Sequence, residues 1–402
     1  MKEGWEYSSI GDLCDKLNGL WKGKIGPFVN VGVIRNANFT KAFTLSFDNI
    51  EYLDVEAKQY KTRKLQKGDL IVEKSGGSEK QPVGRTVLFD KEEGEYSFSN
   101  FTSVLRIKDR SIISPEFLYK YILFVYLRGD TRKMQKATTG IHNIEFDKFL
   151  SIPVPQIPLS EQQSIVDYLD AAFAKIDAMK ANAEKALGEA KALFQASLKE
   201  MMEPKEGWEE KTLKELGHTQ TGTTPSKSDK SNYGDYIEFI RPSEIDYDGI
   251  GGIDYNCEMK LSKKGATNGR IFSSNSIFMV CIGATIGKVG FSTKDISCNQ
   301  QINVFTPKDE INYKFAYYAM KSPSFQYRVI KEGTSSQATL PIINKGKWEQ
   351  LSICFPAIKE QEIIASHLDS LSSKVTELKA NFAKLSQECD ALKQAILRQV
   401  FE

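Results

Sequence analysis

The chain has 402 residues, of which 41% are hydrophobic and 26% charged, and its formal net charge is +2. This length predicts two or more domains, and the composition is typical of folded proteins, which excludes intrinsic disorder. Met1–Trp5 does not resemble a signal peptide, and no apolar run is long enough to cross a membrane, so we expect a cytoplasmic protein without membrane contact. The six cysteines show no C-x-x-C spacing, which predicts reduced thiols and neither a disulfide framework nor a zinc site.

Short β-type runs broken by Gly, Asn and Asp dominate residues 1–158, which we predict to be one domain. We expect strands at Phe43–Phe47, Asp69–Val72, Arg85–Phe89 and Ser103–Ile107. A helix is predicted to follow from Pro115, with Ser114 as its N-cap.

Residues 159–203 are predicted to form a long helix. Its apolar residues recur in alternating steps of four and three, as in the seam of a coiled coil. These are Ile165, Leu169, Ala172, Ile176, Met179, Ala183, Ala186, Ala190 and Leu193. Ser160 and Gln163 predict a capping box at its start, and Pro155 and Pro158 stiffen the joint before it.

Residues 204–357 are predicted to be a second domain with the same order of elements. We expect strands around Tyr236–Ile240, Ile277–Ile282 and Gln301–Phe305, then a helix around Tyr313–Met320. Residues 358–402 then repeat the long helix, with a seam at Leu368, Leu371, Val375, Leu378, Phe382, Leu385, Cys389, Leu392 and Ile396. The sequence therefore predicts an α+β protein, in which two mixed α/β domains are joined by a long antiparallel two-helix coiled coil.

An internal repeat supports this division into two halves. Lys2-Glu3-Gly4-Trp5-Glu6 recurs 203 positions later as Lys205-Glu206-Gly207-Trp208-Glu209. The pairs Glu161-Gln162 and Leu169-Asp170 recur as Glu360-Gln361 and Leu368-Asp369. The sequences at the start and end of the two domains agree, whereas most of the sequence between them differs. This suggests two copies of one domain that recognise different ligands.

No catalytic motif accompanies this architecture. The sequence has no phosphate-binding P-loop, no G-x-S-x-G elbow and no H-E-x-x-H pair, and its histidines (His142, His218 and His367) are not clustered. It also lacks a glycine-rich cofactor loop of an amino-methyltransferase. We therefore predict a protein that is not an enzyme by itself.

Charge and polar clusters favour nucleic-acid binding. The two long helices total −4, so the remaining residues carry a net charge of +6. Arg matches the acceptor edge of guanine, Asn and Gln match adenine, and Lys, Ser and backbone amides bind phosphate. The candidate DNA contacts are Lys22, Lys24, Arg35, Asn36, Arg63, Arg85, Thr139, His142 and Asn143 in the first domain, and Thr223, Thr224, Lys227, Arg241, Lys264, Arg270, Thr285, Lys288, Asn299, Gln300 and Gln337 in the second.

A duplicated variable domain, with each copy followed by a long helix that opens on Glu-Gln, resembles the specificity (S) subunit of bacterial type I restriction–modification systems. The matching motifs are Gly4-Trp5, Gly207-Trp208, Gly222-Thr223-Thr224-Pro225, Gly283-Ala284-Thr285-Ile286-Gly287-Lys288 and the tails Ile157–Asp170 and Ile358–Asp369.

The resemblance implies that each domain is a target-recognition domain for one half of a split double-stranded DNA sequence. It implies that the paired helices space the halves and dock two methyltransferase (M) subunits, which restriction/translocase (R) subunits join. S-adenosylmethionine, ATP and magnesium would then belong to those partners, with no cofactor on this chain. The alternatives are a related specificity subunit with a different arrangement of methylation and cutting, a non-DNA scaffold with two ligand-binding heads, and a self-contained methyltransferase.

Overall fold

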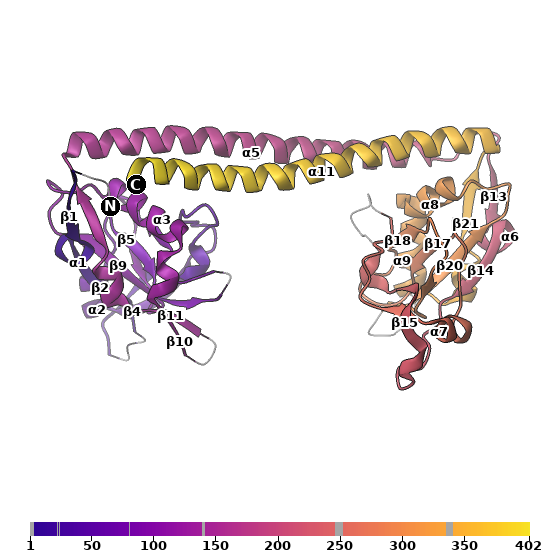
Figure 1. The fold of residues 1–402 in the computed structure, drawn as a ribbon, viewed down its shortest axis with the longest axis horizontal. Coiled ribbons are helices and arrows are strands. Elements are labelled where there is room, and N and C mark those ends of the chain that lie inside the picture. Colours follow the sequence, from indigo (N-terminus) through magenta and orange to yellow (C-terminus); the bar gives the residue numbers. More distant parts are fainter. Residues whose placement is uncertain are drawn as a thin grey trace. The chain divides into compact units, whose positions relative to one another are not determined.

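A computed structural model describes residues 4–21, 23, 25–79, 81–138, 141–245, 252–334 and 341–402 (Figure 1). The chain divides into two compact units. Unit 1 comprises Met1–Lys180 and Ser386–Glu402, and unit 2 comprises Ala181–Leu385. Over the described residues, no helix combines the length and apolar character that a membrane crossing requires.

Unit 1 is built on a four-stranded antiparallel sheet with the order β2-β9-β5-β7. Two three-stranded sheets, β4-β3-β8 and β10-β11-β6, and the pair β1-β12 complete its strands. The strands are β1 (Glu6–Ser9), β2 (Cys14–Asn18), β3 (Phe28–Ile34), β4 (Glu51–Glu56), β5 (Leu70–Glu73), β6 (Ser75–Gly77), β7 (Thr86–Leu88), β8 (Tyr96–Phe98), β9 (Thr102–Ile107), β10 (Gln135–Thr138), β11 (Ile141–Ile144) and β12 (Pro153–Gln156). The helices are α1 (Ile10–Leu13), η1 (Asn36–Asn38), α2 (Ala57–Arg63), α3 (Pro115–Arg128), η2 (Asp130–Met134), α4 (Phe146–Leu150) and the first part of α5 (Leu159–Met201).

Among the described residues, unit 2 repeats this plan except for the sheet β10-β11-β6. Its main sheet has the order β14-β20-β17-β18, beside a sheet β16-β15-β19 and the pair β13-β21. The strands are β13 (Glu209–Thr212), β14 (Gly217–Thr221), β15 (Tyr233–Ile240), β16 (Lys260–Leu261), β17 (Ile277–Val280), β18 (Val289–Phe291), β19 (Ser297–Cys298), β20 (Ile302–Pro307) and β21 (Ser352–Phe355). The helices are α6 (Leu213–Leu216), η3 (Lys230–Asn232), η4 (Pro242–Glu244), α7 (Lys263–Asn268), α8 (Tyr313–Lys321), α9 (Pro323–Thr334), α10 (Lys345–Trp348) and the first part of α11 (Ile358–Phe401).

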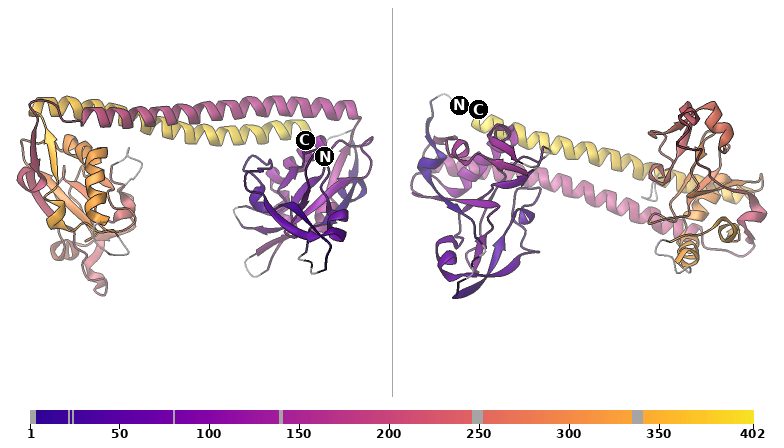
Figure 2. Two further views of the ribbon diagram at one scale, coloured as in Figure 1. Left: turned by 180° about the vertical axis from the view of Figure 1, so that it is seen from behind. Right: turned by 90° about the horizontal axis from the view of Figure 1, so that it is seen from below.

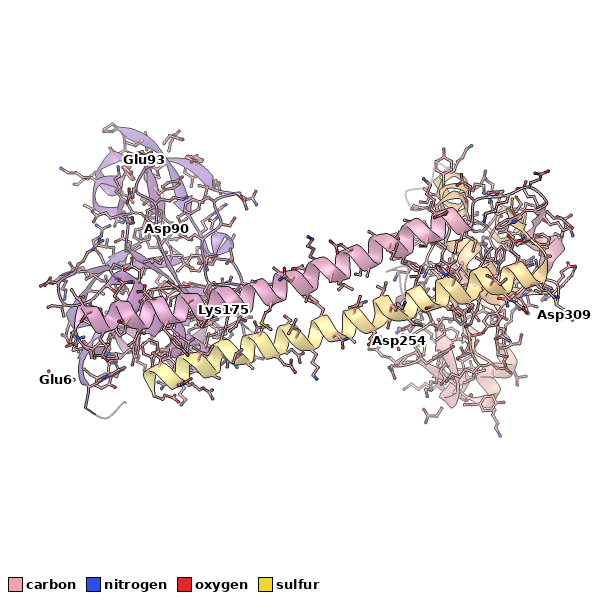
Figure 3. The ribbon with its side chains drawn as sticks, turned by 90° about the horizontal axis from the view of Figure 1, so that it is seen from above. Glu6, Asp90, Glu93, Lys175, Asp254 and Asp309 are labelled. Carbon is pink, nitrogen blue, oxygen red and sulfur yellow. The ribbon has the colours of Figure 1, made fainter. Side chains whose placement is uncertain are left out.

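Each unit contains a segment of both long helices. In unit 1 the ammonium of Lys393 on α11 is 2.6 Å from the carboxylate of Asp177 on α5, and Lys180 is 3.6 Å from Asp390. The α5 numbers rise as the α11 numbers fall, so the two segments are antiparallel. Figure 3 shows them side by side near Lys175. In each unit they lie along one side of the sheets, as Figure 2 shows from behind.

In both units the hydrophobic core includes residues of the long helices. In unit 1 the helix α3 buries Phe117, Leu118 and Ile122, and the ring of Phe401 from α11 lies 5.2 Å from that of Tyr121. Ser114 caps α3 by accepting a hydrogen bond from the Phe117 N–H (3.1 Å), as the sequence predicts. In unit 2 the core includes Phe194 and Leu198 from the last part of α5, and Met202, which follows the helix.

The repeated Glu-Gln pairs now have a structural explanation. Gln162 is buried at the start of α5, where it accepts a hydrogen bond from the Ser114 N–H and donates to the carbonyls of Ile112 and Ile157. Gln361 at the start of α11 accepts from the Asn312 N–H and donates to the carbonyls of Glu310 and Pro356. The glutamine therefore joins the long helix to its own domain in each half, by satisfying buried backbone groups.

The repeated Leu-Asp pairs have a second structural role. Leu169 and Leu368 are fully buried, while Asp170 pairs with Lys120 of α3 and Asp369 pairs with Lys314 of α8. The Tyr318 hydroxyl also donates to Asp369 (2.7 Å). Burial, followed by this hydrogen bond to a carboxylate, raises the pKa of Tyr318 far above its usual value.

The predicted mixed α/β fold with long helices is confirmed, but three local predictions are wrong. Phe43–Phe47 is not a strand, because Phe43 adopts a left-handed conformation with φ of 62°. Ser160 lies inside α5, which begins at Leu159, so it is not the N-cap. The seam is also irregular: Met179, Leu193, Leu378 and Leu392 are exposed, whereas Leu187 and Phe194 are buried. A straight helix of 3.6 residues per turn drifts away from a 3.5-residue repeat, and the buried stripe of α5 moves accordingly.

Candidate nucleic-acid interface

The loops that follow β14, β15, β17 and β19 meet at one edge of unit 2. Thr221 ends β14 opposite Asn303, and Val280 ends β17 opposite Ile302, so both strands stop beside the start of β20. Backbone hydrogen bonds from Asn299 to Ile240 (3.1 Å) and from Thr223 to Cys298 (3.0 Å) bring the ends of β15 and β19 to the same place. We define this second edge as Thr221–Thr224, Arg241–Glu244, Ile282–Lys288 and Asn299–Gln301.

Most candidate contacts of the second domain lie on this second edge. They are Thr223, Thr224, Arg241, Thr285, Lys288, Asn299 and Gln300. Thr224 and Gln300 are hydrogen-bonded to each other, and the amide of Asn299 donates to that of Gln301 (2.8 Å). Arg270 lies beside the edge, since its guanidinium donates to the Thr221 carbonyl. The second edge thus collects hydroxyl, amide and guanidinium groups, which are the groups that bind base edges and phosphates.

Two other candidates lie away from the second edge. Lys227 is exposed in the loop between β14 and β15. Lys264 binds Asp229 (2.9 Å) and the Ser231 hydroxyl (2.8 Å) next to η3. Hydrogen bonds from Ser231 and then from Lys264 lower the pKa of Asp229 to about 2, so this carboxylate stays charged at neutral pH.

Arg241 is held in place at the second edge by carboxylates. Its guanidinium lies 2.8 Å from Glu244 and 3.6 Å from Glu258, and its backbone N–H donates to Glu244 (2.7 Å). Burial alone would raise the pKa of Glu244, but these hydrogen bonds outweigh it and leave the pKa lowered. The hydrogen bond to Glu244 also raises the pKa of Arg241. The guanidinium is therefore a fixed positive charge.

Unit 1 has an equivalent edge, where the loops after β2, β3, β5 and β8 meet. Leu20 donates to the Phe98 carbonyl, Ser99 to that of Ile34, and Lys74 to that of Phe101, each at 2.9 Å. We define this first edge as Gly19–Trp21, Arg35–Asn38, Lys74–Gly77 and Ser99–Phe101. The sheet β10-β11-β6 continues from it, and Figure 1 shows β10 and β11 at the end of unit 1 away from α5 and α11.

The first edge brings four of the candidates together. The Asn36 amide donates to the Ser75 carbonyl (2.6 Å), next to Arg35. His142 and Asn143 lie on β11, opposite Gly77 and Ser75 of β6. Arg63 is nearby, where it donates to the carbonyl of Asn18 at the end of β2 (2.9 Å).

Arg85 differs from the other candidates because it is mostly buried. Its guanidinium lies 2.7 Å from Glu73, whose side chain is 2% exposed, and stacks 5.5 Å from the centre of the Phe39 ring. These contacts hold β7 against β5 beneath the first edge. Its role as a DNA contact stays a prediction. The candidates Lys22, Lys24, Thr139 and Gln337 lie outside the described residues.

The two edges share one backbone frame. Gly19 and Gly222 occupy equivalent places, where an added Cβ would lie 1.9 Å from the Ser99 carbonyl oxygen and 2.1 Å from that of Asn299. Only glycine permits this close approach. Arg35 and Arg241 are equivalent too, because each precedes a 3₁₀ helix whose third residue accepts a hydrogen bond from the arginine N–H.

Comparison with known proteins places the chain in a family. The profile described as type I restriction modification DNA specificity domain matches residues 2–187 and 205–385. The chain belongs to the type I restriction–modification DNA specificity family.

Its relatives include the type I restriction enzyme HindI specificity subunit of Haemophilus influenzae, 23% identical over 92% of this chain and 95% of the relative. The StySPI specificity subunit of Salmonella potsdam is 21% identical over 100% of this chain and 89% of the relative. Membership of this specificity family confirms the predicted resemblance and the prediction of a specificity subunit that is not an enzyme by itself.

Solved structures show the same fold at low identity. A chain from work on complex assembly and conformational transition of the type I R-M system has a TM-score of 0.73 and 16% identity, covering 100% of this chain and 98% of that chain. The HsdS subunit from Thermoanaerobacter tengcongensis has a TM-score of 0.56 and 17% identity, covering 100% and 97%. Both likenesses concern the architecture alone.

Several side chains on or beside the edges of this specificity protein have buried polar atoms without a partner in the described structure. They are Arg35 Nε, Asn36 Oδ1, Ser99 Oγ and His142 Nδ1 in unit 1, and Thr223 Oγ1 and Arg241 Nε in unit 2. Buried polar groups in folded proteins almost always have a partner, because leaving one unpaired costs about 1–3 kcal/mol. Side-chain rotation on binding a polar ligand would relieve this cost. Across the described residues, no three His, Cys, Asp or Glu gather as a metal site would require.

Two residues of the first edge, Trp21 and Phe101, were not among the candidates, because the candidates were chosen as basic and polar side chains. An arginine followed three residues later by a side-chain acceptor, Asn38 after Arg35 and Glu244 after Arg241, is a sequence signal that marks equivalent places on the two edges.

Proposed function

We propose that this protein selects the DNA target of a type I restriction–modification complex by reading a split double-stranded sequence. The first edge contacts one half of the target and the second edge contacts the other. The observation that carries this proposal is the shared backbone frame of the two edges, which places different side chains at equivalent positions.

The chemistry of the edges supports direct reading of bases. Arg35 and Arg241 present guanidinium groups, and Asn36 and Asn299 present amides, which match the acceptor and donor patterns of guanine and adenine in the major groove. Basic residues beside them, such as Arg63 and Arg270, suit phosphate. Because the sets differ, the two halves of the target should be unrelated in sequence.

The internal repeat supports a proposal for the partner subunits. Gln162 with Asp170, and Gln361 with Asp369, anchor the long helices in the same way in both halves. Two equivalent scaffolds suit two copies of one partner, and we propose that two M subunits dock there and that R subunits join them. S-adenosylmethionine, ATP and magnesium would be bound by those partners.

The test is an exchange of residues 204–357 for the corresponding domain of another family member, followed by sequencing of modified bases in cells that also express the M subunit. We expect one half of the modified motif to change and the other to stay. A chimera that alters both halves would refute the assignment of one edge to each half.

Measuring the affinity of the purified chain for DNA at several salt concentrations tests the alternative that the protein is a scaffold that does not bind DNA. A DNA reader should lose affinity steeply as salt rises, because bound phosphates release counterions, and should prefer one sequence over random DNA. Absence of both effects would favour the scaffold.

A further inference from the structure

The two edges differ most at one pair of equivalent positions, those of Trp21 and Thr224. The hydrogen bond from Leu20 to Phe98 corresponds to the one from Thr223 to Cys298, and Gly19 corresponds to Gly222. The next residue along is Trp21 in unit 1 and Thr224 in unit 2. Thr224 is hydrogen-bonded to Gln300, whereas the Trp21 side chain is 65% exposed.

A second pair shows the same contrast. The hydrogen bonds from Thr102 to Ser99 and from Ile302 to Asn299 align the turns before β9 and β20, so Phe101 corresponds to Gln301. Gln301 is hydrogen-bonded to Asn299, while Phe101 is 47% exposed. The first edge thus carries two exposed aromatic side chains at places where the second edge carries a hydroxyl and an amide.

An exposed aromatic ring on a surface of polar DNA-reading groups presents apolar area that is stabilised by leaving water. The backbone of Leu20 and Trp21 is held in place, because the Trp21 N–H donates to the Gln59 side chain (3.2 Å) and Leu20 pairs with Ser99. The backbone that carries the indole is therefore fixed, and the indole is accessible to a ligand bound at the first edge. The ligand that the proposed function puts there is duplex DNA, whose apolar surface lies mainly within the base stack.

We propose that Trp21 inserts between base pairs of the half-target read by unit 1, with Phe101 packing beside it, and that Thr224 and Gln301, at the equivalent places of the second edge, contact their half-target without inserting. Apolar side chains that enter a base step unstack it and bend the duplex. The first half-target is then recognised partly by the ease of unstacking one step, whereas at these two places the second is recognised by hydrogen bonds. This inference rests on the proposed function, because it requires that the first edge bind DNA.

The experiment uses the full chain and a duplex with its recognition sequence, in which 2-aminopurine replaces one adenine in either half. The probe is kept off the base that the M subunit modifies. The domain exchange identifies which half belongs to unit 1. We expect 2-aminopurine fluorescence to rise on binding in that half only, because the probe brightens when it is unstacked.

Three variants make the test specific. Trp21→Ala should abolish the rise and weaken binding by roughly 5- to 100-fold, the range for loss of an aromatic–base contact. Trp21→Phe should retain part of it. Tyr168→Ala removes another half-exposed aromatic of unit 1, on α5, and should change neither quantity. Thermal unfolding of all three variants should match the parent chain, since both side chains are solvent-exposed.

The outcomes separate the two proposals. Specific binding without a rise in fluorescence, an equal rise in both halves, or a rise that Trp21→Ala retains would overturn the wedge and leave the proposed function intact. Failure to prefer any sequence would overturn the proposed function and the wedge with it.

Discussion

The main sheets of units 1 and 2 follow the same strand order, and the long helices join each domain through the same residue types, Gln162 with Gln361 and Asp170 with Asp369. At the edges the backbone hydrogen bonds still correspond, but the side chains do not. Beneath the first edge, the position of Glu73 corresponds to Val280, and Arg85 corresponds to Lys288. The fold therefore determines the positions of the side chains on each edge, while the residue types at those positions can vary. Proteins that recognise different DNA sequences with one fold need this combination.

The largest expected difference between the units concerns the buried ion pair of unit 1. Glu73→Gln should lower the free energy of unfolding of unit 1 by about 3–5 kcal/mol, because it leaves the Arg85 charge buried without its partner. Hydrogen exchange should show the loss in α3 and leave α8 of unit 2 unchanged. Glu92→Gln is the matched control, since the pair with Lys67 is exposed to solvent and should contribute little to the free energy of unfolding. Equal effects of the two substitutions would contradict the prediction.

The equivalence of the two helix joints can be tested by paired substitutions. Gln162→Ala and Gln361→Ala should each cost about 2–4 kcal/mol, because each leaves several buried backbone groups unpaired. Urea unfolding monitored in each unit by hydrogen exchange measures both values. Gln163→Ala provides the control, since its side chain is exposed and bonds only Asp167 among the described contacts. Clearly unequal costs would show that the joints are not equivalent.

The next smaller effect separates the two edges functionally. Arg35→Ala should relax recognition in one half of the target and Arg241→Ala in the other, each by about 1–3 kcal/mol if the guanidinium contacts a base. Modified-base sequencing and binding to single-mismatch duplexes provide the measurement. Lys264→Ala is the control outside the second edge and should leave both halves of the motif unchanged. If one arginine variant relaxed recognition in both halves of the target, the assignment of one edge to each half would be wrong.

The smallest effect is a pH dependence in unit 2. The pKa of Asp229 is lowered to about 2 from 3.8, so its contacts with Ser231 and Lys264 stabilise unit 2 fully above pH 3.8 and are lost as the pH falls through 2. Carboxyl NMR should show this group titrating near 2, and Lys264→Ala should move the midpoint upward. A midpoint at the ordinary aspartate value would show that these contacts are absent in solution.

The sequence predicted the parts of this protein that repeat. The four-three spacing of apolar residues identified both long helices, because a helical period is a local property of the sequence. The duplicated Glu-Gln and Leu-Asp pairs marked corresponding places in the two helices, although their partners, such as Ser114 and Lys120, are distant in sequence. The strand predicted at Phe43–Phe47 was wrong, because β-forming residue types do not reveal the left-handed backbone conformation of Phe43. At the edges, Arg85 looked like Arg35 in sequence, yet Glu73 from another strand buries it, and no local pattern reveals such a partner. Trp21 and Phe101 were missed because their place depends on pairing between distant strands.

The sharing of long helices between units has a consequence for biosynthesis. Leu397 and Phe401 belong to the core of unit 1, although the whole of unit 2 separates them in sequence from the rest of that core. Nascent domains usually fold in order from the N-terminus. Here the sheets of unit 1 are translated first, and the part of their apolar surface that α11 covers stays uncovered while Ala181–Leu385 is made. Deleting 386–402 would therefore destabilise the unit that begins to be translated first and spare the unit that is translated after it.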